Sequence, residues 1–464
     1  MCLRHVRNFA LLLLLLIAWR PLAPAYSLLT HEQLVDLTWE DSIVPLLLSR
    51  YPNLTPAQLD RARSYAYGGC VIQDIGYYPF GDQLFSDLTH YVRSGDFVLA
   101  LFRNAQNADE LAFAIGALTH YIGDSLGHSQ ATNRAVALQF PKLAARYGPS
   151  VNYAEGKHPH VQVEFAFDID QITQHRLAPL GYLRHIGINV PTHQLALAFY
   201  QTYGITENFT AHGQRFNAGA YRMATRKLIP RAAYALTLIH RSHEPPEPDN
   251  ADAKEITNEA ANAAKIGGWD AYRHRAGFET YLIAFFIRIV PKIGPLAMTA
   301  IKGPTTTAEA DYLHSVVSST SMIRNRLTFL TPIANRIAPP AGVTITRLTS
   351  GTDDAHHPFI NRDLDTGLAV APGGYSLTDI TYFTLLGRLT ADPKQTIPPG
   401  IKEDVLAYYN GKTDPKIPAK GTHGWDQAQD ELKTLAAMPT STEAAPYPTY
   451  GEGLSEPSPP ASDH

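Results

Sequence analysis

The most constraining feature of the sequence is a stripe of polar side chains in an apolar helical segment. Between Ala108 and Ser129, apolar residues recur at three- and four-residue spacing, which predicts a buried helix. His120, Asp124 and His128 follow one another at steps of four residues within it. Each step advances a side chain by about 40° around a helix, so all three share one face. Two imidazoles and a carboxylate on one face are typical zinc ligands.

Two further segments carry side chains of the same kinds. His160 and Glu164 stand four residues apart on a predicted helix, so an imidazole and a carboxylate again share one face. Asp74 lies in an apolar and aromatic stretch, where a buried carboxylate needs a partner or a metal ion, and His90 follows it. A single pair of this kind is more often hydrogen-bonded than metal-bound. The pieces taken together predict a metal centre.

The N-terminus has the pattern of a cleaved secretory signal. Basic residues precede the apolar run Phe9–Ala18, and the small residues Ala23 and Ala25 then suit a signal peptidase. A membrane anchor is the alternative, but spanning a bilayer takes about 20 apolar residues and this run is shorter. We therefore expect export, to a periplasm or to the medium, and a mature chain that begins at Tyr26.

Cleavage after Ala25 would bring another set of ligands into play. His31 would lie close to the new N-terminus, and the α-amino group of Tyr26 could itself bind a metal ion. Cleavage would also remove Cys2 and leave Cys70 as the only cysteine, in an apolar stretch typical of a buried thiol. No intramolecular disulfide would then form, and a chain of this length buries a large core without one.

Charge weighs against stable nucleic-acid binding. The formal net charge is -4 at pH 7 and the sequence has no long basic run. Proteins that bind nucleic acid through a groove are usually strongly basic there. The charge does not exclude a nuclease that works through metal ions.

Helical apolar spacing dominates the chain and strand-like alternation is scarce, which predicts an all-α fold. We expect a signal peptide over residues 1–25 and a metal-binding domain over residues 26–243. A Pro-rich acidic linker then opens a helical extension of unknown role, residues 244–438, and a polar tail, residues 439–464, has a disordered composition. Individual helices are predicted over residues 55–67, 108–129, 252–265, 269–290, 308–329 and 376–389.

A second acidic and histidine-rich cluster lies in the extension. It belongs to a stretch between residues 332 and 374 that is interrupted by Gly and Pro and reads as irregular. Two interpretations stay open, a second metal site and a solvated loop, and we expect the loop. The residues concerned are Asp353, Asp354, His356, His357, Asp363 and Asp365.

The ligand pattern resembles the zinc-dependent phospholipase C family over residues 26 to about 241. The same superfamily contains the single-strand-specific zinc nucleases and the N-terminal domain of glycosylphosphatidylinositol-specific phospholipase D. The resemblance implies a multi-helix bundle with a three-zinc cluster, to which the C-terminal helical extension is added. The resemblance rests on His31, Asp74, His90, the helical set His120, Asp124 and His128, and the pair His160 and Glu164.

The resemblance implies which residues share which ion. One zinc would be held by Asp74, His90, His120 and Asp124. A second would be held by His128, His160 and Glu164. The third would be held by His31, by the bridging Asp124 and by the backbone of Tyr26, where the family usually has Trp. Three residues separate Asp124 from His128, whereas the secreted bacterial phospholipases have five; the shorter spacing is expected in the phospholipase D-like branch.

The resemblance further implies an activity. We expect an exported phosphodiesterase that holds two or three Zn²⁺ ions and hydrolyses phospholipid head groups with a metal-activated water. Asp74 is the expected catalytic residue, either as the general base or as the group that orients the attacking water. The substrate is then a phospholipid or another phosphodiester, and contact with a membrane surface follows from it. Two alternatives remain: a zinc nuclease of the same superfamily, and a non-catalytic exported protein that is stabilised by zinc and binds a membrane or a partner.

Overall fold

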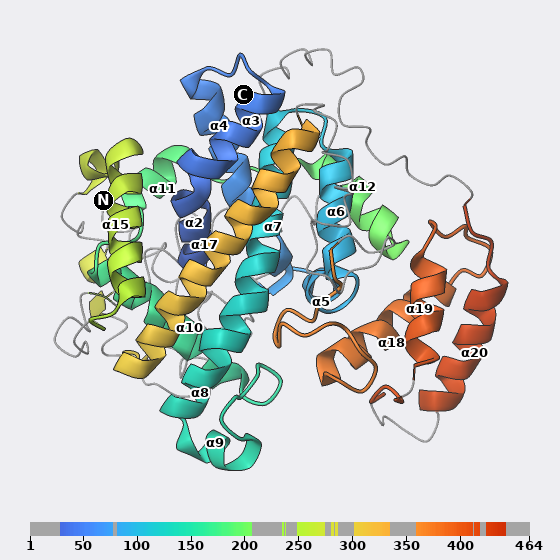
Figure 1. Cartoon of the computed structure of the whole chain (residues 1–464). Helices are drawn as coiled ribbons and strands as arrows, with labels where there is room; N and C mark the ends of the chain where they lie inside the picture. The colour runs from blue at the N-terminus through green and yellow to red at the C-terminus, as the bar shows by residue number, and fades with distance from the viewer. Residues whose placement is uncertain are drawn as a thin grey trace, which may run out of the picture.

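The part of the chain that the structure describes is all-α (Figure 1). In this computed structural model, two isolated bridges, Arg362 with Ala369 and Ile397 with Thr440, are the only strand-like pairings among the described residues. The predicted fold class is therefore confirmed. Among the described helices, none combines the length and the apolar character that crossing a bilayer requires. The described residues are 28–77, 81–206, 234–235, 237, 248–273, 280–282, 284–285, 301–334, 359–411, 413–417 and 424–441.

Short and medium helices build the N-terminal half. In chain order they are α2 Leu28–Thr38, the π-helical turn η1 Trp39–Ile43, α3 Val44–Arg50, α4 Pro56–Gly69, the 3₁₀ turn η2 Gln73–Tyr77, α5 Gln83–Tyr91, α6 Ser94–Asn104, α7 Ala108–Gly127, the π-helical turn η3 His128–Thr132, α8 Asn133–Gln139, α9 Pro141–Tyr147, α10 Lys157–Thr173, α11 Leu180–Ile186 and α12 Thr192–Tyr203. The C-terminal half contributes α15 Ala251–Ile266, the 3₁₀ turn η5 Trp269–Tyr272, α17 Thr306–Ala334, α18 Ser376–Thr390, α19 Ile401–Tyr409 and α20 Gly424–Ala437.

Helix α7 lies at the centre of the bundle (Figure 1). Asn107 caps it, because its side chain accepts a hydrogen bond from the backbone N–H of Glu110 at 3.0 Å. Helix α4 packs directly against α7: a Cβ on Gly116 would lie 2.1 Å from the carbonyl oxygen of Ala66, so only glycine permits this approach. The close packing brings the C-terminal end of α4 next to His120.

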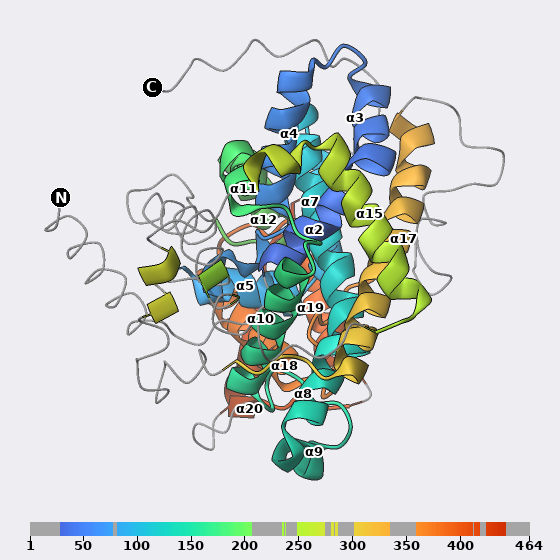
Figure 2. The ribbon, with the colours of Figure 1, turned by 90° about the vertical axis from the view of Figure 1, so that its left-hand side faces the viewer.

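Helices from the predicted extension complete the bundle. Helix α17 lies along α7 and also contacts α2 and α3, and α15 packs beside α17 (Figures 1 and 2). Thr30 Oγ1 of α2 and Tyr312 Oη of α17 share a buried hydrogen bond of 2.9 Å. Arg324 of α17 donates to the carbonyl oxygen of Leu37 at 3.0 Å. Packing is therefore continuous from one predicted region to the other, while the division into domains stays a prediction.

The segment 359–375 leads into a group of three helices, α18, α19 and α20, at one side of the bundle (Figure 1). Helix α18 contacts α5. The segment itself runs over α7 and α5, where Tyr121 donates to the carbonyl oxygen of Ile360 at 2.6 Å. The backbone N–H of Leu364 donates to the carbonyl oxygen of His90 at 3.1 Å. These contacts place residues from the far end of the sequence beside the predicted metal ligands.

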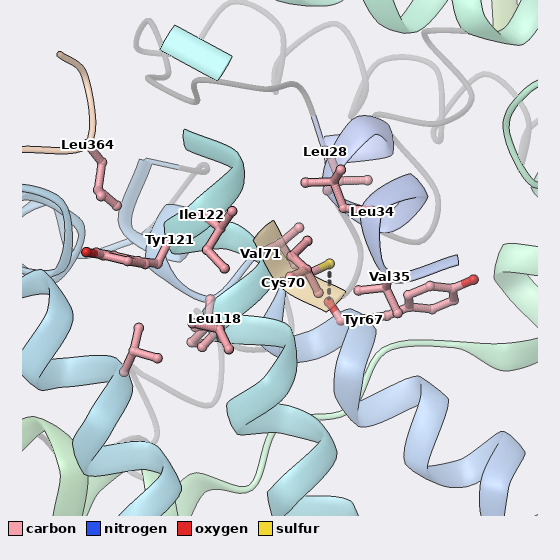
Figure 3. Packing of buried hydrophobic residues seen from close by; sticks show 14 of the residues in the cluster. Leu28, Leu34, Val35, Tyr67, Cys70, Val71, Leu118, Tyr121, Ile122 and Leu364 are labelled. Carbon is pink, nitrogen blue, oxygen red and sulfur yellow. Dashed lines mark hydrogen bonds between the residues drawn. The ribbon is translucent and has the colours of Figure 1, made fainter. Parts of the chain in front are cut away.

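One apolar core joins these elements (Figure 3). Cys70 belongs to it as a free thiol, and its Sγ donates to the carbonyl oxygen of Tyr67 at 3.3 Å. Burial raises the pKa of the Cys70 thiol well above its ordinary value. The buried thiol predicted from the sequence is thus confirmed. Other members of the core include Leu28, Leu34, Val35, Val71, Leu118, Tyr121, Ile122 and Leu364.

The predicted helices are confirmed wherever the structure describes most of their residues. They correspond to α4, to α7 with η3, to α15, to α17 and to α18. Of the predicted helix 269–290, the structure describes the turn η5 and a few residues between 280 and 285. Other predictions lie outside the described residues: the signal peptide 1–25, Tyr26, most of the linker, Asp353, Asp354, His356, His357 and all but the start of the polar tail.

Candidate metal centre

The structure brings eight of the nine predicted metal ligands together as buried side chains. They come from six elements: His31 from α2, Asp74 from η2, His90 from α5, His120 and Asp124 from α7, His128 from η3, and His160 and Glu164 from α10. The ninth, Tyr26, lies outside the described residues, two positions before α2 begins.

Asp124 lies where three histidines meet. Its Oδ1 is 3.2 Å from His31 Nε2, and its Oδ2 is 3.1 Å from His120 Nε2 and 3.5 Å from His90 Nε2. The rings of His31 and His120 stack with their centroids 4.2 Å apart. A carboxylate whose two oxygens face different imidazoles can bridge two metal ions.

Asp74, His90 and His120 form a group on one side of Asp124. His90 Nε2 lies 3.3 Å from Asp74 Oδ1 and 3.4 Å from His120 Nε2. In both histidines, Nδ1 is hydrogen-bonded to a backbone carbonyl oxygen. His90 Nδ1 lies 2.8 Å from the oxygen of Ser86, and His120 Nδ1 lies 2.9 Å from the oxygen of Cys70. When Nδ1–H donates to a carbonyl, the lone pair of Nε2 is left to face the centre, as in metal-bound histidines.

His128, His160 and Glu164 form a second group. His160 Nε2 lies 2.9 Å from Glu164 Oε1, and His128 Nε2 lies 3.9 Å from the same oxygen. His128 opens the π-helical turn η3 that continues α7. Such local widenings of a helix are frequent at functional sites. The four-residue spacing in α10 accounts for the second pair, since it places His160 and Glu164 on one helical face.

The side chains of the centre match the needs of a buried cation. In the described part of the chain, both carboxylate oxygens of Asp74, Asp124 and Glu164 are buried without a hydrogen-bond partner. Among the described residues, these three carboxylates form ion pairs with histidine and with no Lys or Arg. A buried acceptor without a partner costs about 1–3 kcal/mol. Nitrogen and oxygen donors of this kind suit Zn²⁺, which would satisfy them.

The electrostatics of the carboxylates differ from one group to the other. Burial by itself would raise the pKa of Asp124, but the charges of His120 and His31 outweigh it and hold that pKa well below its ordinary value. Burial, reinforced by the nearby carboxylate of Asp124, raises the pKa of Glu164 well above its ordinary value. A cation at Glu164 would therefore replace a proton there.

Residues 30–209 match the sequence profile of the family described as zinc dependent phospholipase C. This segment belongs to that family. All eight described ligands fall inside the matched range, which agrees with the resemblance inferred from the ligand pattern. No curated protein and no solved structure shows a significant match to the chain.

One buried carboxylate beside the centre lies outside the zinc dependent phospholipase C segment. Asp363 and Asp365 were expected in a solvated loop, and this prediction is wrong, since both side chains are buried. The turn that carries them packs against α5, η3 and the start of α8, where Asn133 donates to the carbonyl oxygen of Asp365 at 2.8 Å. Asp365 Oδ1 lies 3.9 Å from His128 Nε2. Leu364, an apolar residue between the two aspartates, was the one local signal of burial.

Proposed function

We propose that the chain is an exported zinc-dependent phosphodiester hydrolase that cleaves phospholipid head groups in the manner of a phospholipase C. The observation that carries the proposal is the set of three buried donor groups, two of which share His120, inside a zinc dependent phospholipase C segment. A structural zinc site needs one closed set of four ligands. Adjoining sets are typical of centres in which metal ions stabilise both the attacking and the leaving oxygen of a phosphate ester.

The proposal assigns each ion to a set of ligands. Asp74, His90, His120 and Asp124 would hold one, and His128, His160 and Glu164 a second. His31 and Asp124 would hold a third together with the mature N-terminal residue, Tyr26. Bound zinc would polarise the phosphoryl oxygens and lower the pKa of a water to near neutrality.

Asp74 is the residue that we assign to proton transfer. It lies 3.3 Å from His90 Nε2, and both of its oxygens are buried without a hydrogen-bond partner in the described part of the chain. One oxygen can bind a metal ion while the other accepts the proton of the attacking water. The backbone carbonyls that hold His90 and His120 keep both rings fixed during that transfer.

Export is part of the proposal, because it would create the remaining ligand. Helix α2 begins at Leu28, and its fourth residue, His31, lies in the centre. Cleavage after Ala25 would leave the α-amino group of Tyr26 only two positions before that helix. N-terminal sequencing of exported protein tests this step: a mature chain that begins at Tyr26 supports it, and an uncleaved or differently cleaved chain contradicts it.

The first test of function is metal content and phosphodiesterase activity of the purified mature protein. Two parallel assays would use p-nitrophenyl-phosphorylcholine and single-stranded DNA. Two or three zinc ions per chain with cleavage of the choline ester are the expected result. Cleavage of DNA alone would move the function to the zinc nucleases. Zinc without either activity would favour the zinc-stabilised, non-catalytic alternative, and protein without zinc would contradict the proposal.

A further inference from the structure

The segment 359–375 places a carboxylate beside the group formed by His128, His160 and Glu164. This segment lies outside residues 30–209, which match the family. Asp365 is buried, and its Oδ1 lies 3.9 Å from His128 Nε2. This separation equals that between Glu164 Oε1 and the same nitrogen. Asp365 and Glu164 therefore each have a carboxylate oxygen at the same distance from His128 Nε2, although Glu164 lies in α10 and Asp365 lies about 200 positions later in the chain.

Backbone contacts on both sides of Asp365 fix its position. His128 Nδ1 lies 2.5 Å from the carbonyl oxygen of Leu364, so the residue before Asp365 orients the imidazole. On the other side, a Cβ on Gly367 would lie 2.1 Å from the carbonyl oxygen of Ser125, and Gly367 has a positive φ of 71°. Only glycine allows this turn to approach α7 so closely. The turn is thus built against the helix that carries the central ligands.

Two tyrosines hold the other oxygen of the carboxylate. Tyr91 of α5 donates to Asp365 Oδ2 at 2.9 Å, and Tyr375 donates a short hydrogen bond to the same atom. Both donors act on Oδ2, which leaves Oδ1 as the oxygen directed at His128. Hydrogen bonds to one carboxylate oxygen are the usual way in which a protein orients a carboxylate that binds a metal through the other.

Distances and charge both favour metal ligation. Two ligands of one tetrahedral zinc, each about 2.0–2.1 Å from the ion, lie about 3.4 Å apart. The 3.9 Å between Asp365 Oδ1 and His128 Nε2 is longer than this, and the compact donor group consists of His128, His160 and Glu164, so Oδ1 would move towards the ion on binding. His128, His160 and Glu164 alone supply one negative charge to a buried divalent cation, and the carboxylate of Asp365 would balance the second. Buried ions without a counter-charge are strongly disfavoured.

We propose that Asp365 is a fourth protein ligand of the metal ion held by His128, His160 and Glu164, so that the region outside the family segment completes the centre. The proposal rests on the metal centre of the proposed function and adds a ligand to it. It does not depend on which phosphodiester is cleaved.

The test compares two isosteric variants of the full mature chain, Asp365→Asn and Asp363→Asn. Asp363 is the matched control, because it is also buried, but its carboxylate accepts from the backbone N–H and the hydroxyl of Thr366. Zinc retention is measured against a chelator of known affinity, and Co²⁺-substituted protein is examined by visible absorption, which reports ligand number. We expect Asp365→Asn to weaken one ion by at least about 100-fold and to change the Co²⁺ spectrum. Asp363→Asn should do neither.

An unchanged chelator midpoint and an unchanged Co²⁺ spectrum in Asp365→Asn would overturn the proposal. Tyr375→Phe keeps the carboxylate and removes one of its donors, so it should weaken the same ion by about 10-fold. This variant decides the matter if Asp365→Asn does not fold. A wild-type protein that binds zinc but cleaves neither substrate would contradict the proposed function alone, and the ligand test would still apply to it.

Discussion

Two buried polar clusters in this protein differ in how the negative charge of their carboxylates is balanced. In the first, Arg93 Nε lies 2.9 Å from Asp96 Oδ2 and 2.8 Å from Asp404 Oδ2, and Arg93 Nη1 donates to the carbonyl oxygen of Thr202 at 2.9 Å. Asn361 also donates to Asp96 at 3.0 Å. In the second cluster, the metal centre, the described side chains are carboxylates and imidazoles.

The difference lies in the source of positive charge. The Arg93 cluster contains its own cation, because the chain supplies a guanidinium. The candidate metal centre has carboxylates that pair only with histidines among the described residues, and the Zn²⁺ ions of the proposed function would supply its further positive charge. Both clusters draw a carboxylate from the C-terminal half, Asp404 in one and Asp365 in the other. The first should therefore respond to mutation of its arginine, and the second to removal of metal.

The largest expected effect separates the clusters by metal content. Asp124→Ala removes the carboxylate that faces three histidines, so bound zinc should be lost and activity should fall by at least about 1,000-fold, equivalent to about 4 kcal/mol. Asp96→Ala removes a buried carboxylate of the Arg93 cluster and should keep its zinc. Metal analysis and kinetics on both purified variants check this. An active Asp124→Ala protein with its full zinc content would contradict the assignment of Asp124 as a metal ligand.

Chelation of the wild-type protein is the next effect in size. Since bound ions stabilise only the folded state, their removal should lower the melting temperature by on the order of 10 °C. Calorimetry with and without chelator measures the change, and added Zn²⁺ should restore the original value. An equal melting temperature in both conditions would show that the centre contributes nothing to stability.

The Arg93 cluster should respond to its own variant. Arg93→Met leaves Asp96 and Asp404 without their cation and should cost about 3–5 kcal/mol of unfolding free energy, with zinc content unchanged. Urea denaturation measures the cost. Lys433→Met is the control, since its ion pair with Asp430 lies on the surface and should contribute no resolvable stability. Loss of zinc in Arg93→Met would show that the two clusters are not independent.

Asp87 is a partly buried carboxylate that pairs with neither an arginine nor the metal centre, and it predicts the smallest effect. Burial raises its pKa from 3.8 to about 6, against the hydrogen bonds from Tyr77 and Gln83. The folded state then holds a proton more tightly than the unfolded state, so stability is full below pH 4 and falls as the pH rises towards 6. Asp87→Asn should remove this fall, worth up to about 3 kcal/mol. Urea unfolding at pH 4 and pH 7.5 tests it, with the exposed Asp60→Asn as control.

The sequence by itself determined the local part of this centre. Helical periodicity fixed the shared face of His120, Asp124 and His128 and that of His160 and Glu164, because a step of four residues has the same geometry in every α-helix. The all-α class followed from the same periodicity. The ligand pattern also pointed to the family that residues 30–209 match.

Only the tertiary structure decided which distant segments lie against those helices. Asp365 lies 274 positions from Tyr91, which donates to it, and its surroundings in the sequence are those of a turn. The contact between them depends on the packing of segment 359–375 on α5 and α7. Whether a carboxylate in a turn meets solvent, an arginine or a metal centre is settled by the surface that it packs against, and nothing in the local sequence encodes that surface.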